Sequence, residues 1–528
     1  MEDLIIRGGT IIDGTGSPRY KADVAIKDGV ITAIGDLSDD AAKNILDASS
    51  LIVAPGFIDS HAHSDTCFLK DTSCASKLFQ GITTEISGQC GSSPFPRKSE
   101  TVKKITRSSS FGHFVDQFER GDYAMAINQA MLVGHGTLRA AVIGYEDRPA
   151  TADELKKMKK LLRQSLEEGA WGLSLGLEYS PGFFADYKEL QELGKVVHEF
   201  GGIVTCHMRN EGLSIAAAIE ELVNIGRASG VHVHISHLKI DNFRVHGSAE
   251  TVWNQIESAR REGVNITADM YPFTASATDL TIRCPKWCSE GGPSAVIDYL
   301  NSPRRQEIIE HIRSHYFNAE RAETCLFSGD GGLWPEIIGK TLRFVAENLL
   351  HTTDYAEAAA EVLMRTRAEA SCIFFVMSES DMMYFLSQDV GIGSDGYAYS
   401  GDPNLVSGMP HPRSYGAVSE FFRLARQNNL CSLEEAVRRV TSKTADTIGL
   451  NDRGVLKKGN IADITVFDPN RITPTATYLD PIRLSAGVHH VLIGGEIALH
   501  NGVQTKMRKG KFLIKSPAAT TPDQIQQC

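Results

Sequence analysis

The chain has 528 residues, more than a single hydrophobic core usually supports, so we expect one large domain with a smaller companion. Hydrophobic residues make up 42% of the chain and charged residues 23%, as in ordinary globular proteins. The formal net charge of −11 argues against nucleic acid or an anionic membrane surface as a partner.

The first residues of the sequence contain no basic segment followed by an apolar one. No run of about 18 apolar residues occurs elsewhere, so we expect a cytoplasmic protein without membrane contact. The ten cysteines are scattered along the chain, without the dense spacing of a disulfide scaffold or a Cys-x-x-Cys zinc knuckle. Most of them are therefore predicted to be reduced and buried.

Both ends of the chain have the pattern of antiparallel strands. Residues 3–35 alternate apolar and polar positions, with Gly8-Gly9, Asp13-Gly14 and Asp28-Gly29 as turn signals. The same strand pattern occurs again at 462–468 and 491–495. We therefore predict one small β domain, a sandwich built from residues 1–54 and 455–515. The Pro/Thr/Gln-rich segment 516–528 is predicted to be a tail.

The middle of the chain alternates apolar runs with amphipathic helices, the pattern of a parallel sheet closed by crossover helices. One helix is marked by the capping box Thr151-x-x-Glu154 and by Gly169 at its end, and others fall at about 213–228 and 249–262. Eight apolar runs are candidate barrel strands: 57–60, 83–87, 130–134, 172–175, 203–206, 233–236, 265–269 and 390–394. The fold class is therefore predicted to be α/β, a (β/α)8 TIM-type barrel over 55–454. The gap at about 281–345 is too long for a simple crossover and is expected to be an inserted subdomain or a lid.

Several candidate metal ligands follow directly after predicted strands. His61 and His63 are two residues apart after the first strand, a spacing that lets both imidazoles point to one place. Cys90 follows the second strand between glycines, and His207 and His237 follow the fifth and sixth strands. A histidine or cysteine alone is usually structural, but barrel active sites are built at this end of the strands. The clustering therefore favours a metal site.

Asp395 follows the eighth predicted strand, in Gly393-Ser394-Asp395-Gly396. Aspartate before glycine is ordinarily a turn residue. Here it is expected on the same rim as the histidines, where a carboxylate can take a proton from a metal-activated water and pass it to a leaving amine.

Other patterns do not support alternative chemistries. The segment 332–341 resembles a phosphate loop, but its glycines are too far apart and a proline interrupts it. Cys284 and Cys288 have no histidine pair nearby, so a structural zinc site is not expected there. No Gly-x-Ser-x-Gly elbow of a serine hydrolase occurs.

Over nearly its whole length the sequence resembles the amidohydrolase superfamily, and within it the D-aminoacylase (N-acyl-D-amino-acid deacylase) family. The matching segments are 55–65 (PGFIDSHAHSD), 88–91 (GQCG), 133–139 (VGHGTLR), 207–211 (HMRNE), 235–239 (ISHLK), 269–272 (DMYP), 393–396 (GSDG), 411–413 (HPR) and 459–468 (GNIADITVFD). The first motif is common to many amidohydrolases. The cysteine at position 90 separates the D-aminoacylase family from dihydroorotase-like and hydantoinase-like enzymes.

The resemblance implies specific roles. Cys90, His207 and His237 correspond to the ligands of one tightly bound zinc, and His61, His63 and Asp395 to a second, weaker metal position. Asp395 corresponds to the catalytic acid/base. The residues that match the family's anchors for the substrate carboxylate are Lys239, Tyr271 and Arg413. Between Asp395 and Arg413 the chain has a longer loop than the family pattern.

The resemblance implies zinc-dependent hydrolysis of the amide bond of small N-acyl-D-amino acids, giving a carboxylate and a free D-amino acid. An L-Xaa-D-Xaa dipeptidase and a cyclic-amide hydrolase remain alternatives on the same scaffold. A catalytically inactive scaffold protein is a further alternative, although every expected metal position and the acid/base aspartate are occupied. The sequence leaves the preferred side chain, the acyl group and the oligomeric state open.

Overall fold

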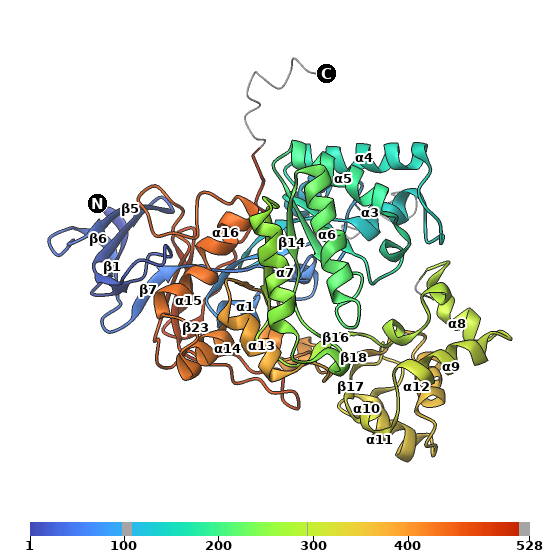
Figure 1. The fold of residues 1–528 in the computed structure, drawn as a ribbon. Helices are drawn as coiled ribbons and strands as arrows, with labels where there is room; N and C mark the ends of the chain where they lie inside the picture. Colours follow the sequence, from blue (N-terminus) through green and yellow to red (C-terminus); the bar gives the residue numbers. More distant parts are fainter. Residues whose placement is uncertain (98–107, 293, 517–528) are drawn as a thin grey trace.

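The computed structural model describes residues 1–97, 108–292 and 294–516, and within them it confirms the predicted barrel (Figure 1). The barrel strands run parallel to one another. They are β8 (Phe57–Asp59), β9 (Ile82–Ser87), β10 (Asn128–Met131) continued by β11 (Val133–Gly134), β12 (Gly172–Gly176), β13 (Ile203–His207), β14 (His232–Ile235), β15 (Ile266–Met270) and β19 (Gly391–Ile392). The first and last strands meet where Ser60 N donates to Ile392 O at 3.4 Å, which closes the ring.

Amphipathic helices cover the outside of the barrel and follow the predicted periodicity (Figure 1). They include α3 (His135–Val142), α4 (Ala152–Glu167), α5 (Tyr187–Glu199), α6 (Ile215–Ser229), α7 (Ala249–Arg261), α13 (Glu379–Ser387), α14 (Arg413–Asn428), α15 (Leu433–Arg439) and α16 (Ser442–Ile448). The capping box at Thr151 is present, and α6 ends at Gly230 in the left-handed conformation that glycine adopts without strain. Gly169 lies one residue beyond the C-cap of α4, also at positive φ.

Strands from both ends of the chain form two sheets that share one apolar core. The first sheet contains β5 (Val30–Gly35), β4 (Asp23–Lys27), β1 (Glu2–Arg7) and β6 (Ala42–Asp47). The second contains β23 (Val503–Gln504), β22 (Glu496–His500), β21 (Val488–Ile493), β20 (Ile464–Phe467), β7 (Ile52–Pro55), β2 (Thr10–Ile11) and β3 (Tyr20–Lys21). β20 pairs antiparallel with β7, which joins the two ends directly. Farther on, Phe512 bridges to Gln129 of the barrel, so the last described residues pack on the barrel.

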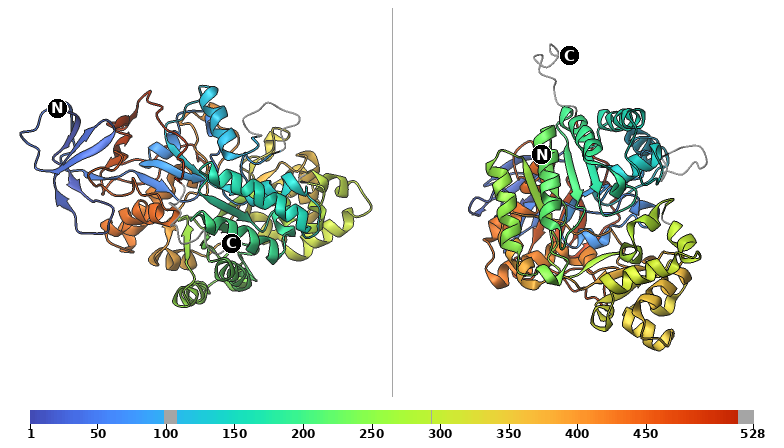
Figure 2. Two further views of the ribbon diagram at one scale, coloured as in Figure 1. Left: turned by 90° about the horizontal axis from the view of Figure 1, so that it is seen from above. Right: turned by 45° about the vertical axis from the view of Figure 1, so that its right-hand side comes forward.

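An inserted unit lies at the opposite end of the barrel from the β domain (Figures 1 and 2). Its sheet consists of β16 (Ser276–Asp279), β18 (Ser371–Phe374) and β17 (Cys325–Gly329). Around the sheet lie α8 (Ala295–Leu300), α9 (Arg305–His315), α10 (Ala319–Glu323), α11 (Leu342–Phe344) and α12 (Tyr355–Arg365). The apolar core of this unit runs from Leu280 to Phe374. It is longer than the expected 281–345 because β18 pairs with both other strands of the sheet.

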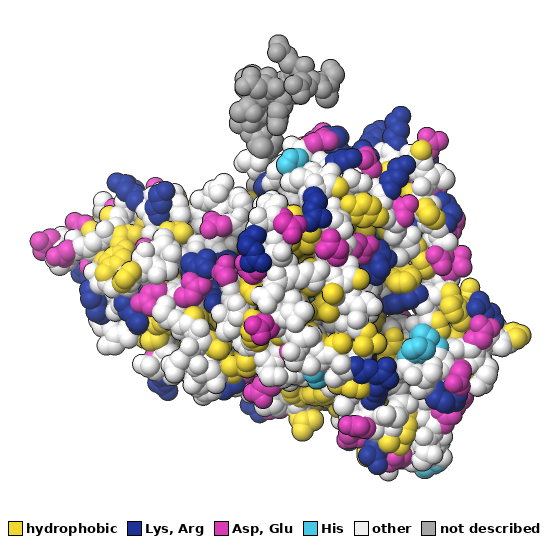
Figure 3. Space-filling model, viewed as in Figure 1, with side chains coloured by type: hydrophobic (Ala, Val, Ile, Leu, Met, Phe, Trp, Pro, Cys, Tyr) yellow, Lys and Arg dark blue, Asp and Glu magenta, His cyan; other side chains and the backbone are white. Residues whose placement is uncertain are grey.

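Nine cysteines lie among the described residues, all are free thiols, and six of them are buried. In the described ranges, no helix combines the length and the apolarity that a membrane crossing requires. The predicted tail, 516–528, lies outside the described residues apart from Ser516. On the face seen in Figure 3, acidic and basic side chains are interspersed.

Candidate metal centre and substrate cavity

A cavity of about 930 Å³ opens at the carboxyl ends of the barrel strands. Barrel residues such as Cys90 and Asp395 line its floor, and Ile282 and Arg283 of the inserted unit line another part of it. The inserted unit is held to the barrel here, since Lys286 Nζ donates to Glu178 O at 2.7 Å and Tyr179 contacts Thr278 at 3.2 Å. The insertion therefore helps to shape the cavity.

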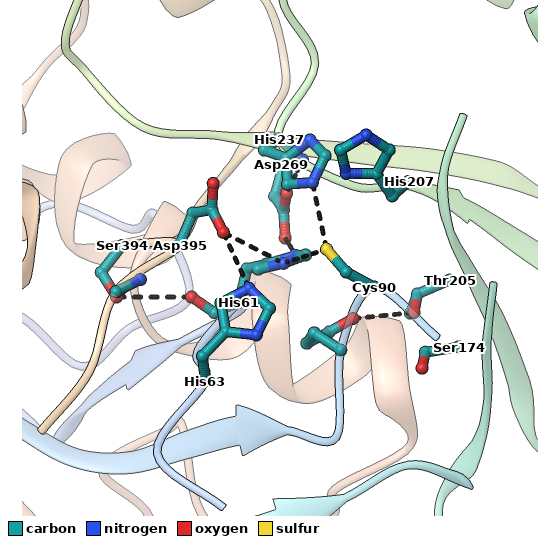
Figure 4. A network of polar contacts seen from close by, with 12 residues as sticks. His61, His63, Cys90, Ser174, Thr205, His207, His237, Asp269, Ser394 and Asp395 are labelled. Carbon is teal, nitrogen blue, oxygen red and sulfur yellow. Dashed lines mark hydrogen bonds and ion pairs between the residues drawn. The ribbon is translucent and has the colours of Figure 1, made fainter. Parts of the chain in front are cut away.

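The structure brings all six predicted metal ligands together (Figure 4), and all of them except the fully buried His61 line this cavity. They form two groups whose ligand atoms lie within 4.8 Å of one another, and Cys90 belongs to both. One group contains Cys90, His207 and His237, and the other contains Cys90, His61, His63 and Asp395. Cys90 Sγ lies 3.3 Å from Nε2 of both His61 and His237. The thiol is thus central to the cluster.

Three of these side chains stand on strained backbone. Cys90, His237 and Asp395 have φ angles of 52°, 39° and 47°, in the left-handed region that non-glycine residues rarely adopt. Such strain persists where the surrounding structure holds it, and it is concentrated at functional sites. The glycines at 88 and 91 also have positive φ, as expected for the bend that carries Cys90.

The donor set fits a zinc ion. Burial, together with the negative charge of Asp395, raises the pKa of the Cys90 thiol well above its usual range, so a thiolate there needs a cation. Nδ1 of His207 is buried and has no hydrogen-bond partner within the described chain. One sulfur and two imidazole nitrogens are ligands that zinc prefers, with an open position left for water or substrate.

Three carboxylates that sequence reasoning did not single out lie beside the histidines: Glu211 and Asp269 are buried, and Glu178 is half-buried. Glu178 lies 3.0 Å from His207 Nε2, Glu211 lies 3.0 Å from His237 Nδ1, and Asp269 accepts from the His237 amide at 2.6 Å. Carboxylates that contact the ring nitrogens, as Glu178 and Glu211 do, orient metal-binding imidazoles. The sequence signal was weak: Glu178 and Glu211 each lie in a loop just after a barrel strand.

Asp395 is held by two neighbours on the cavity floor. Its carboxylate lies 2.9 Å from His63 Nε2 and 2.8 Å from an Arg413 nitrogen. Burial by itself would raise the pKa of Asp395, but Arg413 and the nearby histidines hold this pKa well below its usual range. The residue is therefore an ionised carboxylate, able to accept a proton.

Lys239, Tyr271 and Arg413 meet beside Asp395, despite the long loop before Arg413. The Arg413 guanidinium lies 4.6 Å and the Lys239 ammonium 5.9 Å from the centre of the Tyr271 ring. The Tyr271 hydroxyl is buried without a hydrogen-bond partner in the described chain, and burial raises its pKa to about 12. Two cations and a hydroxyl donor form a pocket suited to a carboxylate.

A buried ion network supports the site from below. Lys77 Nζ lies 2.6 Å from Asp59 and 2.8 Å from the Ser394 hydroxyl, and the Asp59 carboxylate accepts from the His61 and Ser394 amides. Burial raises the pKa of the adjacent Glu85 to about 7, although Lys77 opposes this shift. Lys77 thus joins the first and last barrel strands.

Replacing Lys77 with methionine should lower the free energy of unfolding by about 3–5 kcal/mol, because it leaves the Asp59 charge buried without a cation. Urea unfolding followed by circular dichroism measures this loss. The matched change Lys43→Met removes an exposed partner of Asp3 and should have little effect. Equal stability of the two variants would show that the Lys77 network contributes nothing.

The family of the chain follows from comparison with known proteins. A family model described as "Amidohydrolase family" matches residues 44–296 and 395–499. The chain belongs to the amidohydrolase family. The unmatched stretch between the two segments contains most of the inserted unit.

Individual relatives are similar over nearly their whole length. An N-acyl-D-glutamate deacylase of Alcaligenes xylosoxydans xylosoxydans is 34% identical, covering 93% of each chain, and a D-aminoacylase of the same organism is 32% identical, covering 98% of each. The crystal structure of an N-acyl-D-glutamate deacylase from Bordetella bronchiseptica, complexed with zinc and a phosphonate inhibitor, has a TM-score of 0.82 and 32% identity. It covers 97% of this chain and 99% of its own. A D-hydantoinase structure, 16% identical with a TM-score of 0.57, shares the fold.

Proposed function

We propose that the protein hydrolyses the amide bond of N-acyl-D-amino acids with a zinc ion held by Cys90, His207 and His237. The observation that carries this proposal is the convergence of these ligands, within 4.8 Å of one another, in the cavity that also contains Asp395 and Arg413. The activity named for the deacylase relatives, and the zinc bound to one of them, support it. His61 and His63 would take part in a second, weaker metal position with Asp395.

The chain's own residues account for the proton transfers. Bound zinc would supply a Lewis acid beside the acyl carbonyl. Asp395 is placed to take a proton from the attacking water as the new C–O bond forms, and to deliver a proton to the amine nitrogen as the C–N bond breaks. The products are a carboxylate and a free amino acid.

Lys239, Tyr271 and Arg413 are proposed to bind the substrate's α-carboxylate. Arg413 is paired with Asp395 at 2.8 Å, so a bound carboxylate would share its guanidinium with the acid/base. This arrangement would place the scissile amide next to Asp395. It also makes a free α-carboxylate a requirement for efficient turnover.

The test of the proposed function is release of free amine from paired N-acetyl-D- and N-acetyl-L-amino acids by the zinc-loaded protein. D-selective release supports the proposal. Release only from dipeptides or cyclic amides would assign the site to one of the alternative hydrolases, and no release with any of these substrates would favour an inactive scaffold.

We further propose a preference for acidic side chains, based on Arg283. Its guanidinium lines the cavity and stacks over Phe374 at 4.2 Å and Tyr316 at 5.0 Å. Among the described residues it has no hydrogen bond or ion pair, only these ring contacts and an electrostatic attraction to the Asp241 carboxylate, so its N–H donors can meet an anion. Two relatives are named as deacylases of N-acyl-D-glutamate and N-acyl-D-aspartate, which is consistent with an anionic side chain in this place.

The change Arg283→Met should lower kcat/KM for N-acetyl-D-glutamate by about 10-fold to 100-fold, the effect of a lost charged hydrogen bond. Turnover of N-acetyl-D-methionine should be unchanged or improved. Arg304→Met is the matched control, since Arg304 also stacks in the insertion, 3.5 Å from the Trp287 ring centre. Equal losses on both substrates would contradict a role for Arg283 in side-chain selection.

A further inference from the structure

Glu211 lies in the loop after β13 and is only 2% exposed. Its carboxylate contacts three groups: Lys239 Nζ at 2.5 Å, His237 Nδ1 at 3.0 Å and His207 Nε2 at 3.7 Å. Two of these belong to the candidate zinc ligands and the third to the candidate carboxylate pocket. One buried side chain thus contacts both the candidate zinc ligands and the candidate carboxylate pocket.

The contact with His237 bears on which ring nitrogen carries the proton. Nε2 of His237 faces Cys90 Sγ, so Nε2 must keep its lone pair if it is to bind a metal. Nδ1 then carries the hydrogen and needs an acceptor. Lys239 Nζ is 2.9 Å from Nδ1, but an ammonium can only donate. The Glu211 carboxylate is the neighbour of Nδ1 that can accept.

The contact with Lys239 bears on substrate binding. Lys239 is 7% exposed, and a buried ammonium without a counter-ion is strongly unfavourable. Glu211 supplies that counter-ion and fixes the ammonium beside the Tyr271 ring.

We propose that Glu211 is a positioning residue that couples the zinc site to the carboxylate pocket. It holds His237 in the tautomer that binds metal and holds Lys239 in the place that binds the substrate carboxylate. The part of this inference that concerns substrate binding rests on the proposed function. The part that concerns zinc binding depends only on the ligand set.

The test measures two constants for Glu211→Gln. Zinc affinity is determined by competition with a chromophoric chelator, and KM and kcat are determined with N-acetyl-D-glutamate at saturating zinc. We expect zinc affinity to fall by about 10-fold to 100-fold, as for other carboxylates behind metal-binding histidines. KM should rise by a similar factor because Lys239 loses its partner.

Two further variants separate coupling from general damage. Lys239→Met should raise KM without lowering zinc affinity, and in the double variant the two KM effects should be less than additive, because both changes disrupt one contact. Glu221→Gln is the matched control: Glu221 pairs with Arg209 at 2.9 Å away from the cavity floor, and this change should alter neither constant.

Zinc affinity of Glu211→Gln within twofold of the wild type, or additive KM effects, would overturn the proposal. If the glutamine variant does not fold, Glu211→Asp provides the same measurements, because its shorter side chain keeps the charge but cannot span both partners. A wild type that binds zinc but releases no amine would refute the proposed function and leave the zinc measurement as the test of Glu211.

Discussion

Replacing Asp395 with asparagine should lower kcat for N-acetyl-D-amino acids by about 10²-fold to 10⁴-fold, the contribution typical of a positioned general acid/base. Asparagine keeps the shape of the side chain but cannot take a proton from water. The tight zinc should remain, because Cys90, His207 and His237 are untouched. Amine release and zinc content per chain, measured on the same preparation, give both results.

The control for this prediction is Asp402→Asn. Asp402 lies in the same long loop, where its carboxylate accepts from the backbone N–H of Asn404 at 2.9 Å and from the Asn404 side-chain amide at 2.8 Å, so the change should leave turnover intact. An Asp395→Asn protein that retains more than a tenth of wild-type kcat would show that another group moves the proton. Loss of zinc together with activity would instead show that Asp395 acts chiefly as a metal ligand.

The second large effect is expected at Cys90. In the structure its sulfur is 3.3 Å from both His61 and His237, and it is the one residue shared by the two ligand groups. Cys90→Ala leaves only His207 and His237 for the tight ion, fewer than the three protein ligands of a catalytic zinc. The variant should bind zinc more weakly by over about 10²-fold and lose activity with it.

The matched control is Cys206→Ala, because Cys206 is also a buried thiol but packs in the apolar core beside His207. It should keep full zinc and most of its activity. The measurements are zinc content after purification and amine release with and without added zinc. Stoichiometric zinc and normal turnover in Cys90→Ala would rule out this ligand set.

The barrel could be predicted from the sequence because its physical basis is local. Each strand is a short apolar run and each helix has an apolar face at helical spacing. Thr151 marks a helix start by its side-chain cap, and Gly230 marks a helix end by its left-handed backbone. The insertion was harder to delimit. The last strand of the insertion, β18, belongs to this unit through its pairing with β16 and β17, and no local sequence pattern indicates that pairing.

The candidate site, too, could be predicted from the sequence only in part. His61, Cys90, His207, His237 and Asp395 could be predicted to meet, because each directly follows a strand and parallel strands end on one rim of a barrel. The distances between these side chains, and the sharing of Cys90 between two groups, could not be predicted from the sequence. They depend on left-handed backbone at Cys90, His237 and Asp395, which other parts of the chain hold in place.

The sequence by itself determined the fold class, the positions of the eight strands and the set of residues that meet at their carboxyl ends, since periodicity and strand order are properties of the chain. The tertiary structure alone decided the contacts of Glu178, Glu211, Lys77 and Arg283. The surroundings of these carboxylates, of the lysine and of the guanidinium are defined by neighbours from other strands and from the insertion, and these contacts exist only once the chain has folded.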